Sequence, residues 1–135
     1  MKLQHIGSMA VCAIAVVVAA PALAAAGKFQ FVTGDVRLLD RSGASKPAVK
    51  GLAVEEGDTI ASGQPAMAQV RMNDGGILVI RPNTRLVIKA FQFSGKEDGS
   101  ERAHFSLEKG GVRAVTGEIG KTNKQNYLIQ TPSAS

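Results

Sequence analysis

The segment RMNDGGILVIRPNTRLVI, residues Arg71–Ile88, contains two apolar, β-branched runs separated by turn-forming residues. Asp74 and Gly75 precede the first run, and Pro82 lies between the two runs. An Asp-Gly step favours a two-residue hairpin turn, because both of its residues tolerate positive φ. Proline cannot donate to a strand ladder, so Pro82 ends the first run. The segment predicts consecutive β-strands joined by tight turns.

A two-residue turn at Asp74-Gly75 determines which residues of the flanking strands face each other. The expected pairs are Met72 with Ile77 and Val70 with Val79. A calcium loop would need several more oxygen ligands at alternating positions, and only Asn73 and Asp74 are available. We therefore interpret these residues as structural. The predicted structural turn residues are Gly57, Asp58, Asp74 and Gly75.

The two-residue period extends to both sides of this segment. In AQVRMN, residues 68–73, and in RLVIKA, residues 85–90, every second residue is apolar, so one face of each strand is apolar. Glycine recurs about every ten residues from Gly34 to Gly120, as in chains of short strands. We predict an all-β chain of short strands joined by Gly/Asp turns, arranged as a β-roll or solenoid-like stack. A small β-sandwich is the alternative, and the sequence does not choose between them.

The first residues have the pattern of a secretory signal peptide. Lys2 precedes an apolar stretch, Ile6–Ala20, which is shorter than the ~20 residues of a comfortable membrane span. Pro21 and the small residues after it predict cleavage after Ala24 or Ala26. We therefore divide the chain into a helical signal peptide, residues 1–26, and a β domain, residues 27–135. An uncleaved membrane anchor is the alternative interpretation.

Cysteine and charge content limit the function classes. The single cysteine, Cys12, lies within the signal peptide, so the mature chain has no disulfide, thiol chemistry or thiolate zinc site. About 110 remaining residues suffice for one domain. The net charge of the whole chain is +5, which favours acidic partners. Export separates the protein from nucleic acid, so we expect no nucleic-acid partner.

Basic residues in the central strands form a candidate contact face. They share the outward phase of their strands or end a strand, and would form a basic patch if those strands were neighbours. The alternative is a solvated strand face that discourages edge aggregation. The residues of this predicted face are Arg71, Arg81, Arg85 and Lys89. Acidic envelope polymers are among the partners that such a face would attract.

The sequence contains no complete catalytic or cofactor-binding motif. VTGEIGKT, residues 115–122, ends like a phosphate-binding loop, but Val115 occupies the position that requires glycine. We predict a turn at Gly117–Gly120 instead. His104 is the only histidine of the mature chain and has no evident partner for a metal site or a dyad. We therefore predict no enzymatic activity, no catalytic residues, no metal and no cofactor.

Several motifs, taken in order, resemble the FecR domain family. They are TGDVRLLD, GLAVEEGDTIASGQPAMAQVRMNDGGILVIRPNTRLVI, FSLEKGGVRAV and YLIQTPSAS. Their order is similar to the family's succession of Gly-x-Val, Leu-x-x-Gly-Asp-x-Ile, Asp-Gly, Leu-x-x-Gly and Thr-Pro steps. The resemblance runs from about Phe31 to the end of the chain.

The resemblance implies a coiled or roll-like, non-enzymatic domain that contacts other cell-envelope proteins. Regulators of the family carry a sigma-factor-binding segment and a membrane span, whereas this chain is similar to the stand-alone exported members. Family members continue beyond the Thr-Pro step into a further strand, so we expect the chain to be truncated at its C-terminal end.

These observations predict an exported FecR-like module for protein–protein interaction or envelope signalling. We expect it in the periplasm or on the cell surface, with membrane contact only through the signal peptide and with unidentified envelope proteins as partners. The alternative is an envelope domain that binds peptidoglycan or another polysaccharide through the predicted basic face.

Overall fold

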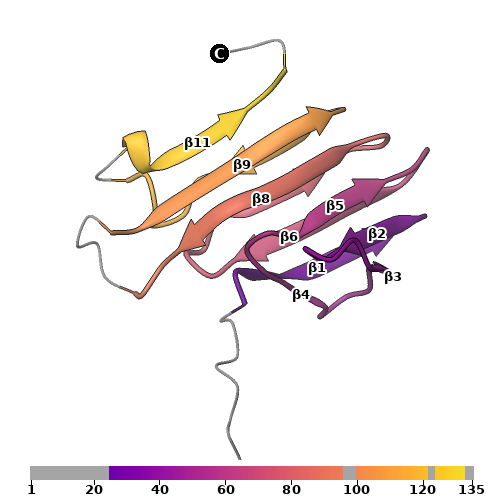
Figure 1. The fold of residues 1–135 in the computed structure, drawn as a ribbon, viewed down its shortest axis with the longest axis horizontal. Coiled ribbons are helices and arrows are strands. Elements are labelled where there is room, and N and C mark those ends of the chain that lie inside the picture. The colour runs from indigo at the N-terminus through magenta and orange to yellow at the C-terminus, as the bar shows by residue number, and fades with distance from the viewer. Residues whose placement is uncertain (1–24, 96–99, 122–123, 133–135) are drawn as a thin grey trace, which may run out of the picture.

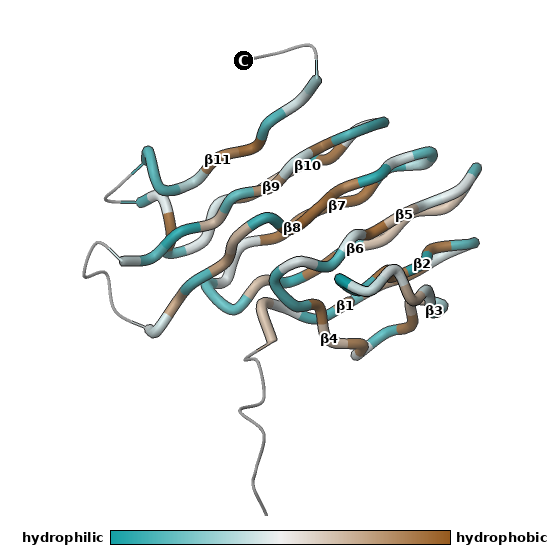
Figure 2. The backbone as a smooth tube through the Cα atoms, viewed as in Figure 1, coloured by the Kyte–Doolittle hydropathy of each residue, from teal (hydrophilic) through white to brown (hydrophobic). Residues whose placement is uncertain are grey.

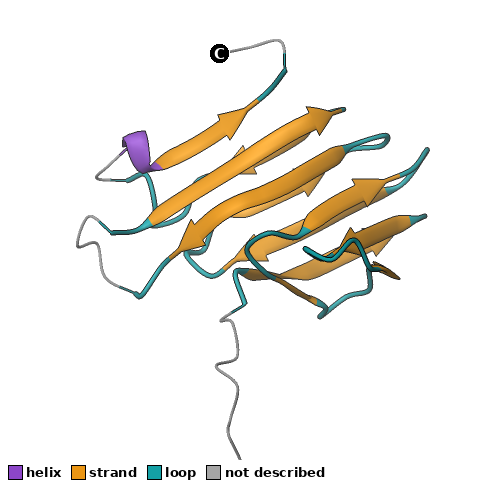
Figure 3. Ribbon diagram, viewed as in Figure 1, coloured by secondary structure: helices purple, strands orange, loops and turns teal. Residues whose placement is uncertain are grey.

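The computed structural model describes residues 25–95, 100–121 and 124–132. They form strands and connecting turns, with one short 3₁₀ helix, η1, at Lys124–Asn126 (Figure 3). Within these ranges, no helix is both long and apolar enough to cross a bilayer. The predicted signal peptide lies outside the described residues, apart from its last two positions.

Five strands form the first sheet, sheet A. In spatial order they are β10 (Val112–Val115), β7 (Ile77–Ile80), β6 (Met67–Met72), β1 (Gly27–Thr33) and β4 (Ala53–Val54). All neighbours in this sheet are antiparallel. A register shift in β1 between Phe29 and Phe31 places both aromatic residues opposite consecutive residues of β6, so they point to opposite faces.

Six strands form the second sheet, sheet B. In spatial order they are β11 (Tyr127–Gln130), β9 (Arg102–Lys109), β8 (Arg85–Gln92), β5 (Thr59–Ser62), β2 (Val36–Leu39) and β3 (Ser45–Pro47). The pairing of β11 with β9 is parallel, and the other pairs are antiparallel. The two sheets lie in separate layers (Figure 1).

The two sheets share one apolar core. Alternate residues of the central strands are buried, as in β6 and β7. Hydrophobic segments lie along the strands of both layers (Figure 2). Each fully buried Leu, Ile or Phe side chain contributes about 1.5–3 kcal/mol relative to an exposed one. The largest fully buried apolar side chains are Phe29, Phe105, Ile60, Leu78, Ile80, Leu86, Ile88, Ile119, Val36, Val54 and Val70.

The all-β prediction is confirmed, with two open sheets. Strands β1 to β11 belong in turn to sheets A, B, B, A, B, A, A, B, B, A and B. This succession is not a regular coil repeat, so the described residues match the sandwich alternative better than a solenoid-like stack. The separation into layers follows from the two-residue period, because each strand has one apolar face to bury.

The hairpin between β6 and β7 forms, but its predicted register is wrong. The turn contains three residues, Asn73, Asp74 and Gly75, and is closed by a bond from Met72 N–H to the Gly76 carbonyl (2.8 Å). Gly75 has φ +87°, which fits a turn followed by a left-handed residue. The observed pairs are Ala68 with Ile80, Gln69 with Val79, Val70 with Leu78 and Arg71 with Ile77.

Candidate functional site

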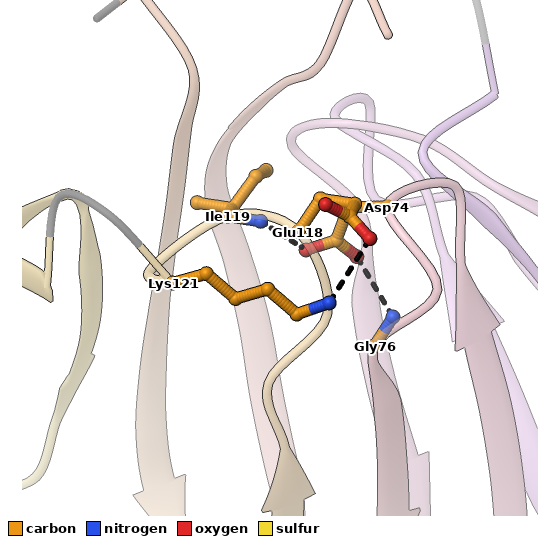
Figure 4. A network of polar contacts seen from close by, with 5 residues as sticks. All are labelled: Asp74, Gly76, Glu118, Ile119 and Lys121. Atoms are coloured by element: carbon orange, nitrogen blue, oxygen red, sulfur yellow. Dashed lines mark hydrogen bonds and ion pairs between the residues drawn. The ribbon is translucent and has the colours of Figure 1, made fainter. Parts of the chain in front are cut away.

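Asp74 lies at the corner of the β6–β7 hairpin and is 4% exposed. Its Oδ1 atom accepts a hydrogen bond from Gly76 N–H (3.0 Å), and its Oδ2 atom accepts one from Ile119 N–H (3.2 Å), as Figure 4 shows. The Asp74 carbonyl accepts a third bond, from Glu118 N–H (2.8 Å). The side chain therefore accepts hydrogen bonds from the backbone of two segments, the β6–β7 turn and the turn after β10.

The turn after β10 closes over this corner. Glu118 and Lys121 form an exposed ion pair (3.1 Å, Figure 4), and Lys121 N–H donates to the Glu118 carbonyl (3.3 Å). The turn therefore spans Glu118–Lys121, one residue later than the predicted Gly117–Gly120. Burial raises the pKa of Tyr127 to about 12, and the nearby charge of Asp74 adds to this effect.

Asp58 has a similar structural role at the start of β5. Its Oδ2 atom accepts a hydrogen bond from Glu55 N–H (2.8 Å), while Gly57, with φ +91°, completes the turn. Burial raises the pKa of the Asp58 carboxyl, and the bond from Glu55 N–H partly opposes this shift. Among the described residues, no group of three or more His, Cys, Asp or Glu side chains is placed to hold a metal ion.

The four residues of the predicted basic face are divided between the two sheets. Arg71 lies in β6 of sheet A and Arg81 directly follows β7, whereas Arg85 and Lys89 lie in β8 of sheet B. Strands β6 and β8 are not neighbours, so the condition for a single patch is not met. Arg85 instead pairs with Glu108 on the adjacent strand (2.8 Å).

On the outer face of sheet A, charged and apolar residues lie side by side. Lys28 faces Arg71, Arg71 faces Ile77, and Ile77 faces Val115, so these four residues form one row across four strands. Lys28 and Arg71 are exposed, and Val115 is 50% exposed. The row changes from cationic to aliphatic along its length.

A second row runs beside the first on the same face. Phe31 faces Gln69, Gln69 faces Val79, and Val79 faces Arg113. Phe31 is 52% exposed, although a phenyl ring is normally buried. The five strands of sheet A contain no Asp or Glu. The outer face of sheet A thus combines apolar area with uncompensated positive charge.

A groove of about 800 Å³ lies beside the β6–β7 hairpin, and Lys28 and Arg71 of the first row are among the residues that line it. Buried Phe29 and Met72 and half-buried Phe93 line it, and three exposed cations surround it: Lys28, Lys50 and Arg71. Gly51 N–H donates to the Phe29 carbonyl (2.8 Å), which holds the segment carrying Lys50 beside β1.

Sequence reasoning found Arg71 but missed Lys28, Lys50 and Phe93. These residues belong to separate segments, and only strand pairing brings them together. The alternation in GKFQ, residues 27–30, was the one available signal, because it directs Lys28 away from the core side of Phe29. Lys50 lies in a connecting segment with no period to indicate its direction.

The sequence model of the family described as "FecR protein" matches residues 58–135. The chain belongs to the FecR family. The FecR match includes β5 to β11 and therefore Arg71, while Lys28 and Lys50 precede it. The resemblance expected from about Phe31 is thus matched from residue 58 onward.

This FecR-family chain was also compared with curated proteins and with solved structures. No curated protein matches it. A solved structure titled "Cell surface anchoring domain" is similar at 21% sequence identity and a TM-score of 0.44, covering 45% of this chain and 80% of that chain. The family assignment rests on the family match alone.

Proposed function

We propose that this protein is an exported, non-enzymatic interaction module of the bacterial cell envelope, which contacts another envelope protein through the outer face of sheet A. One observation carries the proposal: the exposed apolar side chains of this face lie beside cations, in strands that contain no carboxylate. Membership of the FecR family supports an envelope role without catalysis.

Exposed apolar area is the first support for a protein partner. Of the large apolar side chains that are most exposed among the described residues, Phe31, Met67 and Val115 lie in sheet A. Grouped apolar residues on a surface favour association, because contact removes them from water at about 25 cal/mol per Å². The neighbouring cations would orient an acidic partner.

The environment of the carboxylates supports a role other than catalysis. Asp58 and Asp74 are buried and accept backbone hydrogen bonds, so they are engaged in turns. His104 lies half-buried on β9. An acid–base pair requires groups that reach a substrate, and these side chains serve the fold instead.

Export places the module in the periplasm or on the cell surface, and we propose cleavage after Ala24. Ala26 is 3% exposed, its N–H donates to the Val54 carbonyl (2.7 Å), and its carbonyl accepts from Asn73 N–H (2.8 Å). Cleavage after Ala26 would remove these contacts. Intact-mass measurement of protein recovered from the envelope should give Ala25 as the first residue.

A polysaccharide-binding function remains the second candidate, with a changed surface. The predicted patch of Arg71, Arg85 and Lys89 is divided between two sheets, whereas Lys28 and Arg71 are adjacent. Acidic wall polymers would be attracted to such cations, and salt would weaken the attraction. If the protein binds purified cell wall and salt does not weaken that binding, the cations are not its basis. This result would exclude the candidate.

The test is a saturable pulldown from envelope extract with the tagged full chain. Val115→Ser should reduce capture of the partner by about fivefold, because loss of one exposed apolar contact costs on the order of 1 kcal/mol. Leu128→Ser is the matched control, since Leu128 is 42% exposed and lies in sheet B. No saturable partner, or an equal loss with both variants, would contradict the proposal.

A further inference from the structure

The groove beside the β6–β7 hairpin has features of a binding site and shares Lys28 and Arg71 with the proposed contact face. Lys28 and Arg71 are paired neighbours on β1 and β6, and Lys50 reaches the same groove from the segment before β4. A volume of about 800 Å³ is sufficient for several side chains of a ligand. Three cations therefore surround one concave surface.

The charges in the groove are unequally compensated. The two carboxylates that line it are engaged, because Asp74 accepts two backbone hydrogen bonds and Glu118 pairs with Lys121. In contrast, no ion pair joins Lys28, Lys50 or Arg71 to a carboxylate of the described residues. The groove consequently offers free positive charge and favours a carboxylate-bearing ligand.

Each of the two side-chain amides of the groove already uses one of its polar groups in a hydrogen bond. Gln30 Oε1 accepts a hydrogen bond from Gln69 Nε2 (2.9 Å), and Asn73 Nδ2 donates to the Ala25 carbonyl. A sugar presents many hydroxyl groups and needs free side-chain partners. The remaining exposed surface combines cations with the half-buried apolar side chain of Phe93, since Phe29 and Met72 are almost fully buried. This chemistry fits alternating acidic and apolar groups better than a glycan.

We propose that the groove binds an extended acidic peptide segment of the partner protein, with carboxylates at Lys28, Lys50 and Arg71 and an apolar side chain against Phe93. The inference rests on the proposed function and names the partner's chemistry. Continuity supports it, because Lys28 and Arg71 belong both to the groove and to the row that continues into Ile77 and Val115.

The experiment measures binding of a fluorescein-labelled peptide of alternating Glu and Leu to the full chain by anisotropy. The triple variant Lys28→Gln, Lys50→Gln, Arg71→Gln should weaken binding about tenfold, because three exposed charge contacts are lost. The matched control is Lys46→Gln, Lys89→Gln, Lys109→Gln, which removes the same charge from strands of sheet B. This control should change binding less than about twofold.

Phe93→Ser separates the apolar contribution from the charge. It should weaken the Glu-Leu peptide but not a Glu-Ser peptide, whose small polar side chains have no apolar contact to lose. A Lys-Leu peptide should not bind, since its charges are repelled. Equal weakening by both triple variants would overturn the inference by showing general charge attraction, and tighter binding of polygalacturonate would overturn it in favour of a glycan.

The pulldown distinguishes failure of this inference from failure of the proposed function. If the groove variant loses the peptide but captures the envelope partner as the unaltered chain does, the groove is not part of the contact. If the unaltered chain captures no saturable partner, the proposed function itself fails. Joint loss of peptide and partner in the groove variant, with both retained in the sheet B control, supports the inference.

Discussion

The carboxylate of Asp74 accepts a hydrogen bond from the backbone N–H of Ile119, 45 residues later in the chain (3.2 Å). Asp74 is 4% exposed and Ile119 is fully buried. The bond connects the β6–β7 hairpin to the turn after β10, and the Gly76 N–H shares the same carboxylate (3.0 Å). One side chain thus satisfies donors from two segments that would otherwise be unpaired away from water.

Replacing Asp74 should destabilise the fold strongly. Asp74→Ala leaves the N–H groups of Gly76 and Ile119 without this acceptor, and we expect the free energy of unfolding to fall by about 3 kcal/mol. Asp74→Asn keeps one acceptor oxygen and should cost about half as much. Urea denaturation followed by circular dichroism measures both changes. Asp35→Ala, at an exposed position, is the control, and an equal loss there would contradict the structural role of Asp74.

Metal removal should leave stability unchanged. Asp74 accepts backbone hydrogen bonds with both carboxylate oxygens and Asp58 with one, and no third acidic or histidine side chain of the described residues completes a metal site at either turn. A bound Ca²⁺ would stabilise the folded state by mass action. We expect the same urea midpoint in EDTA and in excess Ca²⁺. A midpoint that rises with Ca²⁺, and no longer does so in Asp74→Ala, would show that the corner holds an ion.

Gly117 should tolerate no side chain. The limit is the lack of space around its Cα atom, not its φ angle. An added Cβ would lie 2.3 Å from the Asp74 carbonyl oxygen and 2.3 Å from Gly76 N, both backbone atoms. We expect Gly117→Ala to lower the free energy of unfolding by about 2–3 kcal/mol. Gly43→Ala is the comparison, since a Cβ there meets no atom within 4 Å and only its φ of +87° is strained.

That comparison should cost about 1 kcal/mol, the usual penalty for a left-handed residue. Thermal or urea unfolding of both variants gives the order. If Gly43→Ala is the more damaging of the two, close packing between the Asp74 corner and the turn after β10 is not the constraint that the structure indicates.

Tyr127 should titrate late in the folded protein. It is the only tyrosine and the chain has no tryptophan, so phenolate absorbance reports on this residue alone. Burial, assisted by Asp74, raises its pKa to about 12, whereas the unfolded value is about 10. Absorbance titration in buffer and in urea should give these two values, and a folded pKa near 10 would contradict the burial of the ring.

The Tyr127 shift also predicts how stability depends on alkaline pH. The pKa is higher in the folded state, so the unfolded chain loses its proton first as the pH rises. Stability should therefore decline as the pH rises from about 10 to about 12, and the contribution of this group should be constant below that window. Urea midpoints across the window measure the decline. The decline should be smaller in Asp74→Asn, because one cause of the shift is removed.

Local features of the chain were predictable because they depend on near neighbours. The alternation in β6 identified Ala68, Val70 and Met72 as its buried face, and the Asp-Gly step located the hairpin. The length of the turn was predicted wrongly, since two-residue and three-residue turns share the same Asp-Gly chemistry. That one residue shifts the partner of Arg71 to Ile77.

The sequence by itself determined the strand class, the approximate places of the β6–β7 turn and the turn after β10, and the membership of the FecR family, because side-chain period, glycine placement and motif order are properties of contiguous residues. Only the tertiary structure decided which cations share a surface. Arg71 and Lys89 have equivalent outward phases in the chain but lie in different sheets, while Lys28 and Arg71, far apart in sequence, are paired. The physical reason is that phase fixes the face of a strand, whereas strand order and layer are set by long-range burial and backbone pairing.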